Sequence, residues 1–209
     1  MGGIASFFLE GDVWMMPIAA VSVVVLAVVV ERAYALMVAY NTNAPKLYGQ
    51  ILDAIKRNQD ADAIKVCDQA GKSALAHVLK NGISHAHAGE EAVATAIEEA
   101  TLEVTPKVQK RVHALGGLSS LATLLGLLGT VMGLIEAFRV VAEAPADQKA
   151  VLLTKSIAVA MNTTAFGLMV AIPGTMAYLL LNGSMKKIID DMEVYSAKLE
   201  NTLRDRKNR

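Results

Sequence analysis

Three mainly apolar stretches of this 209-residue sequence contain polar side chains, and six of these could line one path. They are Ser119, Thr123 and Thr130 in one stretch and Asn162, Thr163 and Thr164 in another. Together they predict a polar seam along a narrow path that holds water or hydrogen-bonds a titrating group. Tight helix packing is the alternative, because Ser and Thr hydroxyls also donate to the backbone of their own helix.

The apolar stretches contain none of the side chains that titrate near neutral pH. Asp, Glu, Lys, Arg and His are absent from residues 13–30, 114–135 and 156–181. A proton relay at membrane depth needs an Asp, Glu or His. If this chain conducts protons, the missing carboxylate must therefore come from a partner.

These stretches are long enough to cross a membrane. A helix rises about 1.5 Å per residue, so roughly 20 residues cross a hydrocarbon core of about 30 Å. In lipid each span must satisfy its own backbone hydrogen bonds, so each is predicted to be a helix. The expected transmembrane helices are residues 13–31, 114–136 and 156–181, which makes the chain an all-α integral membrane protein in the lipid bilayer.

Composition narrows the classes of function. Hydrophobic residues make up 54% of the chain and charged residues 19%, the net charge is zero and the mean hydropathy is +0.40. Such values exclude a disordered chain and a basic nucleic-acid binder, and they disfavour a soluble enzyme. No catalytic constellation or phosphate loop is present, and no cofactor or metal site is expected. His85 and His87 are interpreted as part of a solvated loop.

The basic residues predict an orientation. None lies in residues 1–12, ten lie in 32–113, three in 137–155 and seven after 181. The positive-inside rule places the N-terminus outside and the C-terminus in the cytoplasm. Residues 1–12 are then an outer interfacial segment, 32–113 a cytoplasmic helical segment, 137–155 an outer turn and 182–209 a cytoplasmic helical tail.

The cytoplasmic parts are also predicted to be helical. Short helices are expected at 45–57, 60–70 and 74–81. Apolar positions from Val93 to Val112 keep a helical spacing that runs straight into the second span, and Pro106 is a possible kink. A second apolar stripe follows the third span, from Ile188 to Leu203. The second and third transmembrane helices thus extend into the cytoplasm as long amphipathic helices, whose stripes pack within one chain or between copies.

Small residues follow a heptad-like spacing in the second span. The stripe is Gly116, Ser119, Thr123, Gly126, Thr130, Gly133 and Ala137. Small residues let membrane helices approach closely, and Gly129 and Gly133 have the GxxxG spacing that favours association. Gly126, Gly129, Gly133 and, in the third span, Gly167 are therefore predicted to pack helices together.

Three motifs in order resemble one family. Residues 126–133, Gly-Leu-Leu-Gly-Thr-Val-Met-Gly, resemble the second-span signature of the MotA/TolQ/ExbB proton-channel family. Residues 164–168 followed by Ala171-Ile172-Pro173 resemble its third-span signature, and Met16-Pro17-Ile18 leading to Glu31-Arg32 resembles its first span. Three spans with a short outer turn are more similar to the TolQ/ExbB branch than to the four-span flagellar branch.

The resemblance implies a homopentamer around a dimer of single-span partners of the ExbD/TolR/MotB type. The partner would bring the membrane-embedded aspartate, and proton passage would drive a motor in the bacterial inner membrane. Thr130 and Thr164 match the pore-facing threonines beside that aspartate, and Pro173 matches a third-span proline where a helix can bend.

The sequence departs from the TolQ/ExbB branch at one position. Third spans of that branch often carry a glutamate five residues before the threonine, where this chain has Val159. The pair Thr163-Thr164 is more similar to the flagellar branch, so a three-span gliding-motor relative stays open beside outer-membrane uptake and envelope maintenance. A passive helical scaffold is the alternative function, and a solute transporter is weaker because no inverted repeat is present.

Overall fold

The computed structural model describes residues 13–207, and the regular structure in that range is helical throughout. Three of its helices are long and apolar enough to cross a membrane, which confirms the predicted all-α membrane fold. The chain divides into two compact units. Within the described residues, the span unit comprises 13–30 and 113–179, and the polar unit comprises 31–112 and 180–207. The predicted interfacial segment 1–12 lies outside the described residues.

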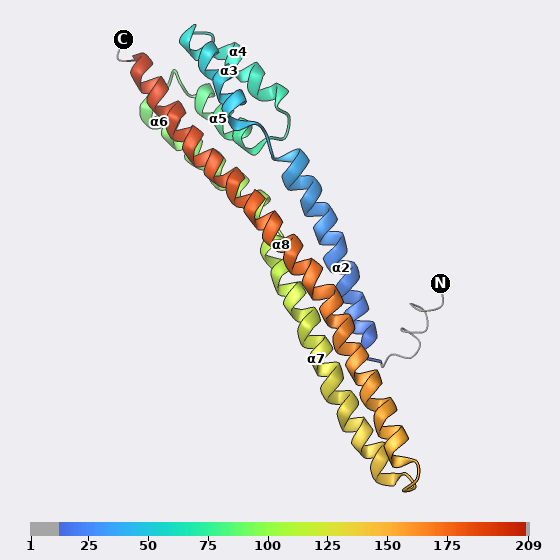
Figure 1. Ribbon diagram of the computed structural model, residues 1–209. Helices are drawn as coiled ribbons and strands as arrows, with labels where there is room; N and C mark the ends of the chain where they lie inside the picture. Colours follow the sequence, from blue (N-terminus) through green and yellow to red (C-terminus); the bar gives the residue numbers. More distant parts are fainter. Residues whose placement is uncertain (1–12, 208–209) are drawn as a thin grey trace. The chain divides into compact units, whose positions relative to one another are not determined.

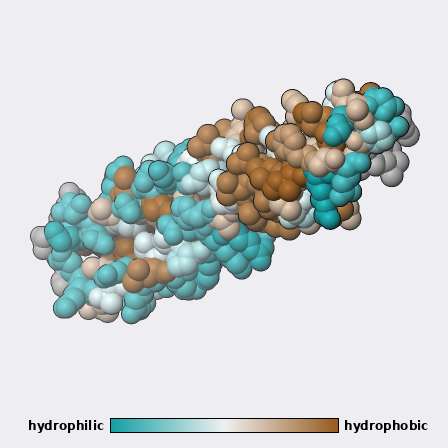
Figure 2. All heavy atoms as spheres, turned by 90° about the horizontal axis from the view of Figure 1, so that it is seen from below, coloured by the Kyte–Doolittle hydropathy of each residue, from teal (hydrophilic) through white to brown (hydrophobic). Residues whose placement is uncertain are grey.

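Parts of three helices form the span unit: α2 (Met15–Tyr34), α7 (Val112–Glu143) and α8 (Lys149–Lys207) (Figure 1). Their contact centres on Ile18 of α2, Ala122 of α7 and Ala171 of α8, which are all buried. Many other large side chains point outward, and Leu124 and Ile172 are more than half exposed. Figure 2 shows apolar side chains gathered on the surface of this unit, as expected of a surface that faces lipid or neighbouring helices.

The polar unit begins with the end of α2 and a π-helix (Ala35–Ala39). It continues with α3 (Ala44–Lys56), α4 (Asp60–Gln69), α5 (Ala74–Ser84) and α6 (Glu90–Gln109), and with the C-terminal part of α8. The three short helices predicted from the sequence are therefore confirmed, with ends that differ by up to three residues.

Local sequence accounts for where these short helices begin and end. The Asn43 side chain accepts a hydrogen bond from the backbone N–H of Lys46, and Ser73 caps α5 in the same way at Ala76. Such caps satisfy backbone donors that a helix leaves free in its first turn. Gly71, which follows α4, has a φ of +63°, a value that glycine adopts without steric penalty.

The helix that was predicted to run unbroken into the second span is interrupted. It ends at Gln109, and α7 begins at Val112. Lys110 is extended, and its N–H bonds to the carbonyl of Pro106 and closes α6. Arg111 has a φ of +60°, which is unfavourable for a non-glycine residue, and its guanidinium pairs with the Glu31 carboxylate. The ion pair connects the interruption to Glu31 of α2.

Both amphipathic stripes pack inside the chain. The stripe of α6 is buried from Val93 to Val108, and Met192 and Leu199 of α8 are fully buried. Gly82 of α5 lies between the two helices, because a methyl group added there would come within 2.8 Å of Ile97 and 3.1 Å of Leu199. The within-chain alternative therefore accounts for the apolar positions of both stripes.

Candidate functional site

The structure brings Thr130 of α7 and Thr164 of α8 into direct contact through their hydroxyl groups. Both hydroxyls are also within hydrogen-bond distance of the same acceptor, the backbone carbonyl oxygen of Gly126. This oxygen is 3.2 Å from Thr130 Oγ1 and 2.8 Å from Thr164 Oγ1. The two threonines are half-buried. Residues 34 positions apart in the sequence thus form one polar cluster between two apolar helices.

Glycine makes this approach possible. A methyl group added at Gly126 would come within 3.2 Å of the Cα atoms of Gly167 and Thr164. One added at Gly167 would come within 2.7 Å of the Ala122 carbonyl oxygen. Because these neighbours are backbone atoms, they cannot swing aside as a flexible side chain would. The backbones of α7 and α8 are in contact at the level of the threonine pair.

The other two glycines that were predicted to pack helices lie along the same seam. A methyl group at Gly133 would come within 2.8 Å of the Ala160 methyl group, and one at Gly129 would overlap the side chain of Thr163. Small residues therefore face each other from α7 and α8 over several turns. Pro173 lies inside α8, where it cannot donate a backbone hydrogen bond, and the helix continues past it.

The hydrogen-bond directions limit the chemistry of the threonine pair. Each hydroxyl has one proton, and the Gly126 carbonyl and the neighbouring hydroxyl are the available acceptors inside the cluster. When both protons are used there, the remaining lone pairs act as acceptors. The cluster is then suited to accept a hydrogen bond from a protonated carboxylic acid or from water. Donation to a carboxylate requires a hydroxyl to rotate away from Gly126.

Two other predicted hydroxyls are placed differently. Ser119 is fully buried, donates to the Leu115 carbonyl at 2.9 Å, and stands where a methyl group on Gly174 would come within 2.5 Å. Thr163 is also fully buried and donates to the Val159 carbonyl at 3.3 Å. Both hydroxyls donate to their own helix, and both side chains pack against a glycine of another segment. Neither hydroxyl is therefore part of the threonine pair.

Thr123 lies in a shallow groove of about 390 Å³ between α7 and α8. The groove is otherwise apolar except for Thr175, a residue that sequence analysis did not single out. The helical spacing of Thr164, Ala171 and Thr175 could have indicated this residue, because it puts the Thr175 hydroxyl on the same face of α8 as Thr164. Asn162 is half-buried and lies outside the residues that line this groove.

No residue within the described spans 13–30, 114–135 and 156–181 can carry a proton as an acid or base near neutral pH. Nor does the described part of the chain contain a cluster of three or more His, Cys, Asp or Glu side chains arranged to hold a metal ion. The threonine cluster can therefore orient or exchange hydrogen bonds with a titrating group, but that group is not part of this site.

Comparison with known proteins identifies the class. The model of the MotA/TolQ/ExbB proton channel family matches residues 70–194, more than half of the chain. The chain therefore belongs to the MotA/TolQ/ExbB proton channel family, which is a family of transport proteins rather than enzymes. Membership and the three apolar helices indicate a membrane protein of the bacterial inner-membrane type.

Individual relatives carry the ExbB name. The biopolymer transport protein ExbB of Aquifex aeolicus is 34% identical over 95 residues, which cover 44% of this chain and 61% of that protein. A putative ExbB homolog of Methanothermobacter thermautotrophicus is 23% identical over 193 residues, which cover 92% of this chain and 68% of the relative. Among solved structures, a chain of C. jejuni MotAB is 13% identical with a TM-score of 0.49, covering 93% of this chain and 85% of that one.

Proposed function

We propose that this chain is a proton-channel subunit, of the stator type, in a membrane motor driven by the proton-motive force. Five copies surround a dimer of a single-span partner similar to ExbD, TolR or MotB, and an aspartate of the partner carries the proton. Proton passage then energises envelope transport or motility. The N-terminus is outside and the C-terminus is in the cytoplasm, following the distribution of basic residues.

The observation that carries the proposal is the threonine pair on the Gly126 carbonyl, in spans that have no Asp, Glu, Lys, Arg or His. A channel for protons needs a group that takes up and releases them, and a partner carboxylate supplies it. The lone pairs of Thr130 and Thr164 accept a hydrogen bond from the protonated acid. This contact favours the neutral form and raises the carboxyl pKa. Loss of the proton removes that stabilisation, so each turnover makes and breaks the contact.

The first experiment replaces Thr130 or Thr164 with Val in the full chain, purified with its partner and reconstituted in vesicles. The expected result is a loss of proton flux of roughly tenfold or more, equivalent to about 1.4 kcal/mol or more of lost hydrogen bonding. The matched control is Thr154→Val. Thr154 is exposed and donates only to its own helix at 2.8 Å, so its loss leaves flux unchanged. Normal flux in both Thr130→Val and Thr164→Val contradicts the assigned roles.

The alternative function is a passive helical scaffold, and the close packing of Gly126 against Gly167 favours it. A scaffold tolerates Thr→Val throughout the spans but not Gly167→Leu, which forces α7 and α8 apart. It also produces no proton flux in vesicles. The two functions are therefore separated by measuring flux and assembly on the same set of variants.

A further inference from the structure

The charges of the polar unit are sorted by their distance along the chain from the spans. The chain passes between the two units at three joins, before Glu31, after Val112 and before Leu180. The first layer is defined as the eight positions of the polar unit nearest each join, which are 31–38, 105–112 and 180–187. The second layer is the next eight positions from each join, which are 39–46, 97–104 and 188–195.

The two layers have opposite net charge. The first layer has six basic residues and one acid, Glu31, and its net charge is +5. The second layer has six acids and one basic residue, Lys46, and its net charge is −5. The basic residues of the first layer are Arg32, Lys107, Lys110, Arg111, Lys186 and Lys187. The acids of the second layer are Glu98, Glu99, Glu103, Asp190, Asp191 and Glu193.

Half of the basic residues in the first layer are uncompensated. Arg32 and Arg111 share the single carboxylate of Glu31, and Lys107 pairs with Glu103 of the second layer. Three exposed cations remain, and none of the ion pairs among residues 13–207 includes them: Lys110, Lys186 and Lys187. The first layer therefore presents positive charge that the described chain does not neutralise.

Helix packing brings these cations to one level of the unit. Helices α6 and α8 are antiparallel, because Glu90 pairs with Arg204 whereas Ile97, later in α6, and Leu199, earlier in α8, lie against the same glycine of α5. Both helices rise by the same amount per residue, so counting onward places the last residue of α6 level with Lys187.

The first layer is within reach of lipid headgroups. Helix α8 passes through its join without a break, and Lys186 follows Leu181, the last residue of the third apolar run, by five positions. Five residues of helix rise about 7.5 Å, and the headgroup layer on each side of the hydrocarbon core is about 5–7 Å thick. The flexible lysine stem covers the difference. Lys110 stands four positions before Ala114, where the second apolar run begins.

The first layer also exposes apolar side chains. Four of its large hydrophobic residues are more than half exposed: Tyr34, Met37, Val38 and Leu180. In the rest of the described polar unit only Leu102 and Val194 are exposed among large hydrophobic residues. Tyr34 is three positions after Glu31, which places it on the helix face where Arg111 reaches Glu31. A tyrosine beside cations and exposed apolar residues is typical of a membrane–water interface.

We propose that the first layer binds the phosphate groups of anionic phospholipids, in the leaflet on the side of the polar unit. The ammonium groups of Lys110, Lys186 and Lys187 bind the phosphates, and Tyr34 lies among the headgroups and upper acyl chains. This proposal depends on the membrane fold and not on proton conduction.

The acids of the second layer do not cancel this attraction. Asp190 and Asp191 follow Lys186 and Lys187 by four positions, so they lie about 6 Å farther from the membrane. At physiological ionic strength the Debye length is about 8 Å, and screening weakens their repulsion of a phosphate more than the attraction of the nearer lysines.

The test places one fluorescent reporter in the first layer. Trp14 is the only tryptophan of the chain, so Trp14→Phe combined with Tyr34→Trp gives a full-length chain with a single reporter. This chain is reconstituted in phosphatidylcholine vesicles that contain equal amounts of brominated phosphatidylglycerol or brominated phosphatidylcholine, because bromine quenches tryptophan on contact. At low salt, phosphatidylglycerol is expected to be enriched beside the reporter by roughly threefold or more, the strength of a few exposed charge pairs. High salt removes the preference.

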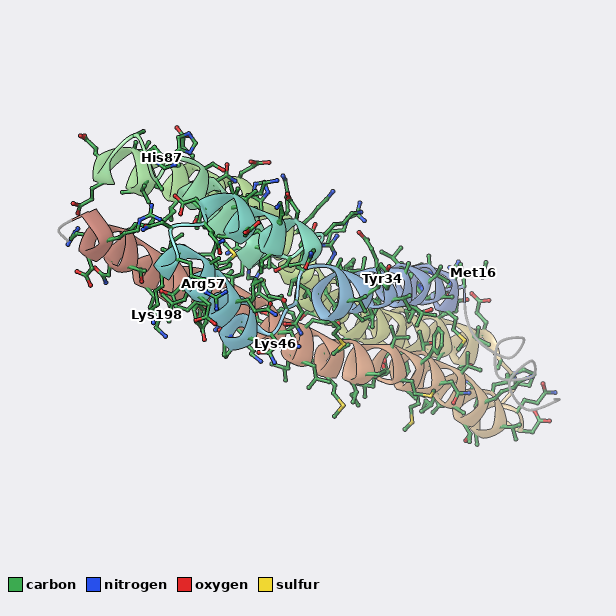
Figure 3. The ribbon with its side chains drawn as sticks, turned by 90° about the horizontal axis from the view of Figure 1, so that it is seen from above. Met16, Tyr34, Lys46, Arg57, His87 and Lys198 are labelled. Carbon is green, nitrogen blue, oxygen red and sulfur yellow. The ribbon has the colours of Figure 1, made fainter. Side chains whose placement is uncertain are left out.

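Two triple variants of the reporter chain locate the binding charges. The first neutralises the uncompensated cations of the first layer by Lys110→Gln, Lys186→Gln and Lys187→Gln. The matched control removes the same charge from exposed positions elsewhere by Lys56→Gln, Arg57→Gln and Lys198→Gln. Figure 3 shows Arg57 and Lys198 well away from Tyr34 along the polar unit. The first variant is expected to lose the preference for phosphatidylglycerol and the control to keep it. Unchanged quenching by brominated phosphatidylcholine verifies that both variants remain inserted.

The other outcomes overturn the proposal. Absence of quenching by either lipid shows that position 34 is not at the lipid surface. Equal quenching by the two lipids shows membrane contact without selection of anionic headgroups. A preference that survives in the first triple variant, or that is lost in both, shows that these three lysines are not the binding groups. Proton flux measured beside any of these results leaves the proposed channel function standing.

Discussion

The contact between α7 and α8 makes a sharp prediction for Gly167→Ala. The added methyl group would come within 2.7 Å of the Ala122 carbonyl oxygen and 3.0 Å of the Gly126 Cα atom, so the helices must separate. Overpacking of this kind costs about 1–3 kcal/mol, and replacing a helical glycine with alanine returns about 0.5–1 kcal/mol. The expected net destabilisation is about 0–2.5 kcal/mol.

Gly117→Ala is the matched control, because its added methyl group would have no atom within 4 Å apart from its two chain neighbours and the nearby backbone of its own helix. It keeps the helix benefit without the clash, so it is expected to stabilise the chain by about 0.5–1 kcal/mol. The difference between the two variants then isolates the packing cost, about 1–3 kcal/mol. Denaturant unfolding in detergent micelles, followed by circular dichroism, measures it. Equal stability of Gly167→Ala and Gly117→Ala refutes the inferred backbone contact.

The polar unit carries two further predictions. Arg206 donates to both carboxylate oxygens of Asp60 at 2.5 and 3.0 Å, and the Asp60 side chain is only 13% exposed. Arg206→Ala should therefore lower the free energy of unfolding by about 1.5–3 kcal/mol, measured by denaturant unfolding. The control is Lys56→Ala, at an exposed position, which should change that free energy by no more than about 0.5 kcal/mol. Equal effects of the two substitutions would contradict a stabilising role of the ion pair. Burial raises the pKa of the Cys67 thiol from 9.0 to about 12. Above pH 9 the thiol loses its proton in the unfolded chain but keeps it in the folded chain. The free energy of unfolding of the wild type should therefore fall as the pH rises above 9, relative to that of Cys67→Ala. Parallel pH profiles of this free energy in the two proteins would rule the prediction out.

The sequence predicts the positions of most helices because the patterns that indicate a helix are local. The lengths of the apolar runs, the caps at Asn43 and Ser73 and the helical spacing of buried positions each depend on residues within a few turns. The interruption at residues 110–111 was missed. The Arg111 side chain there pairs with Glu31, which is 80 positions away in the sequence, and no local pattern indicates that contact. Continuous apolar spacing on both sides of the interruption favoured an unbroken helix.

Some features of the candidate site also follow from the sequence, whereas others depend on how the helices pack. Residue types alone determined that the spans contain no group that titrates near neutral pH and that glycines recur at helical spacing. If the chain conducts protons, it follows that the carrier comes from a partner. Residue types left open whether Thr163 or Thr164 faces Thr130, because neighbouring residues on a helix point about 100° apart and spacing does not set how a helix is rotated against its neighbour. Backbone contact at Gly126 and Gly167 sets that rotation and height. The family resemblance had singled out Thr130 and Thr164. The tertiary structure shows that their hydroxyls are in contact and that Thr163 is buried in the packed interior.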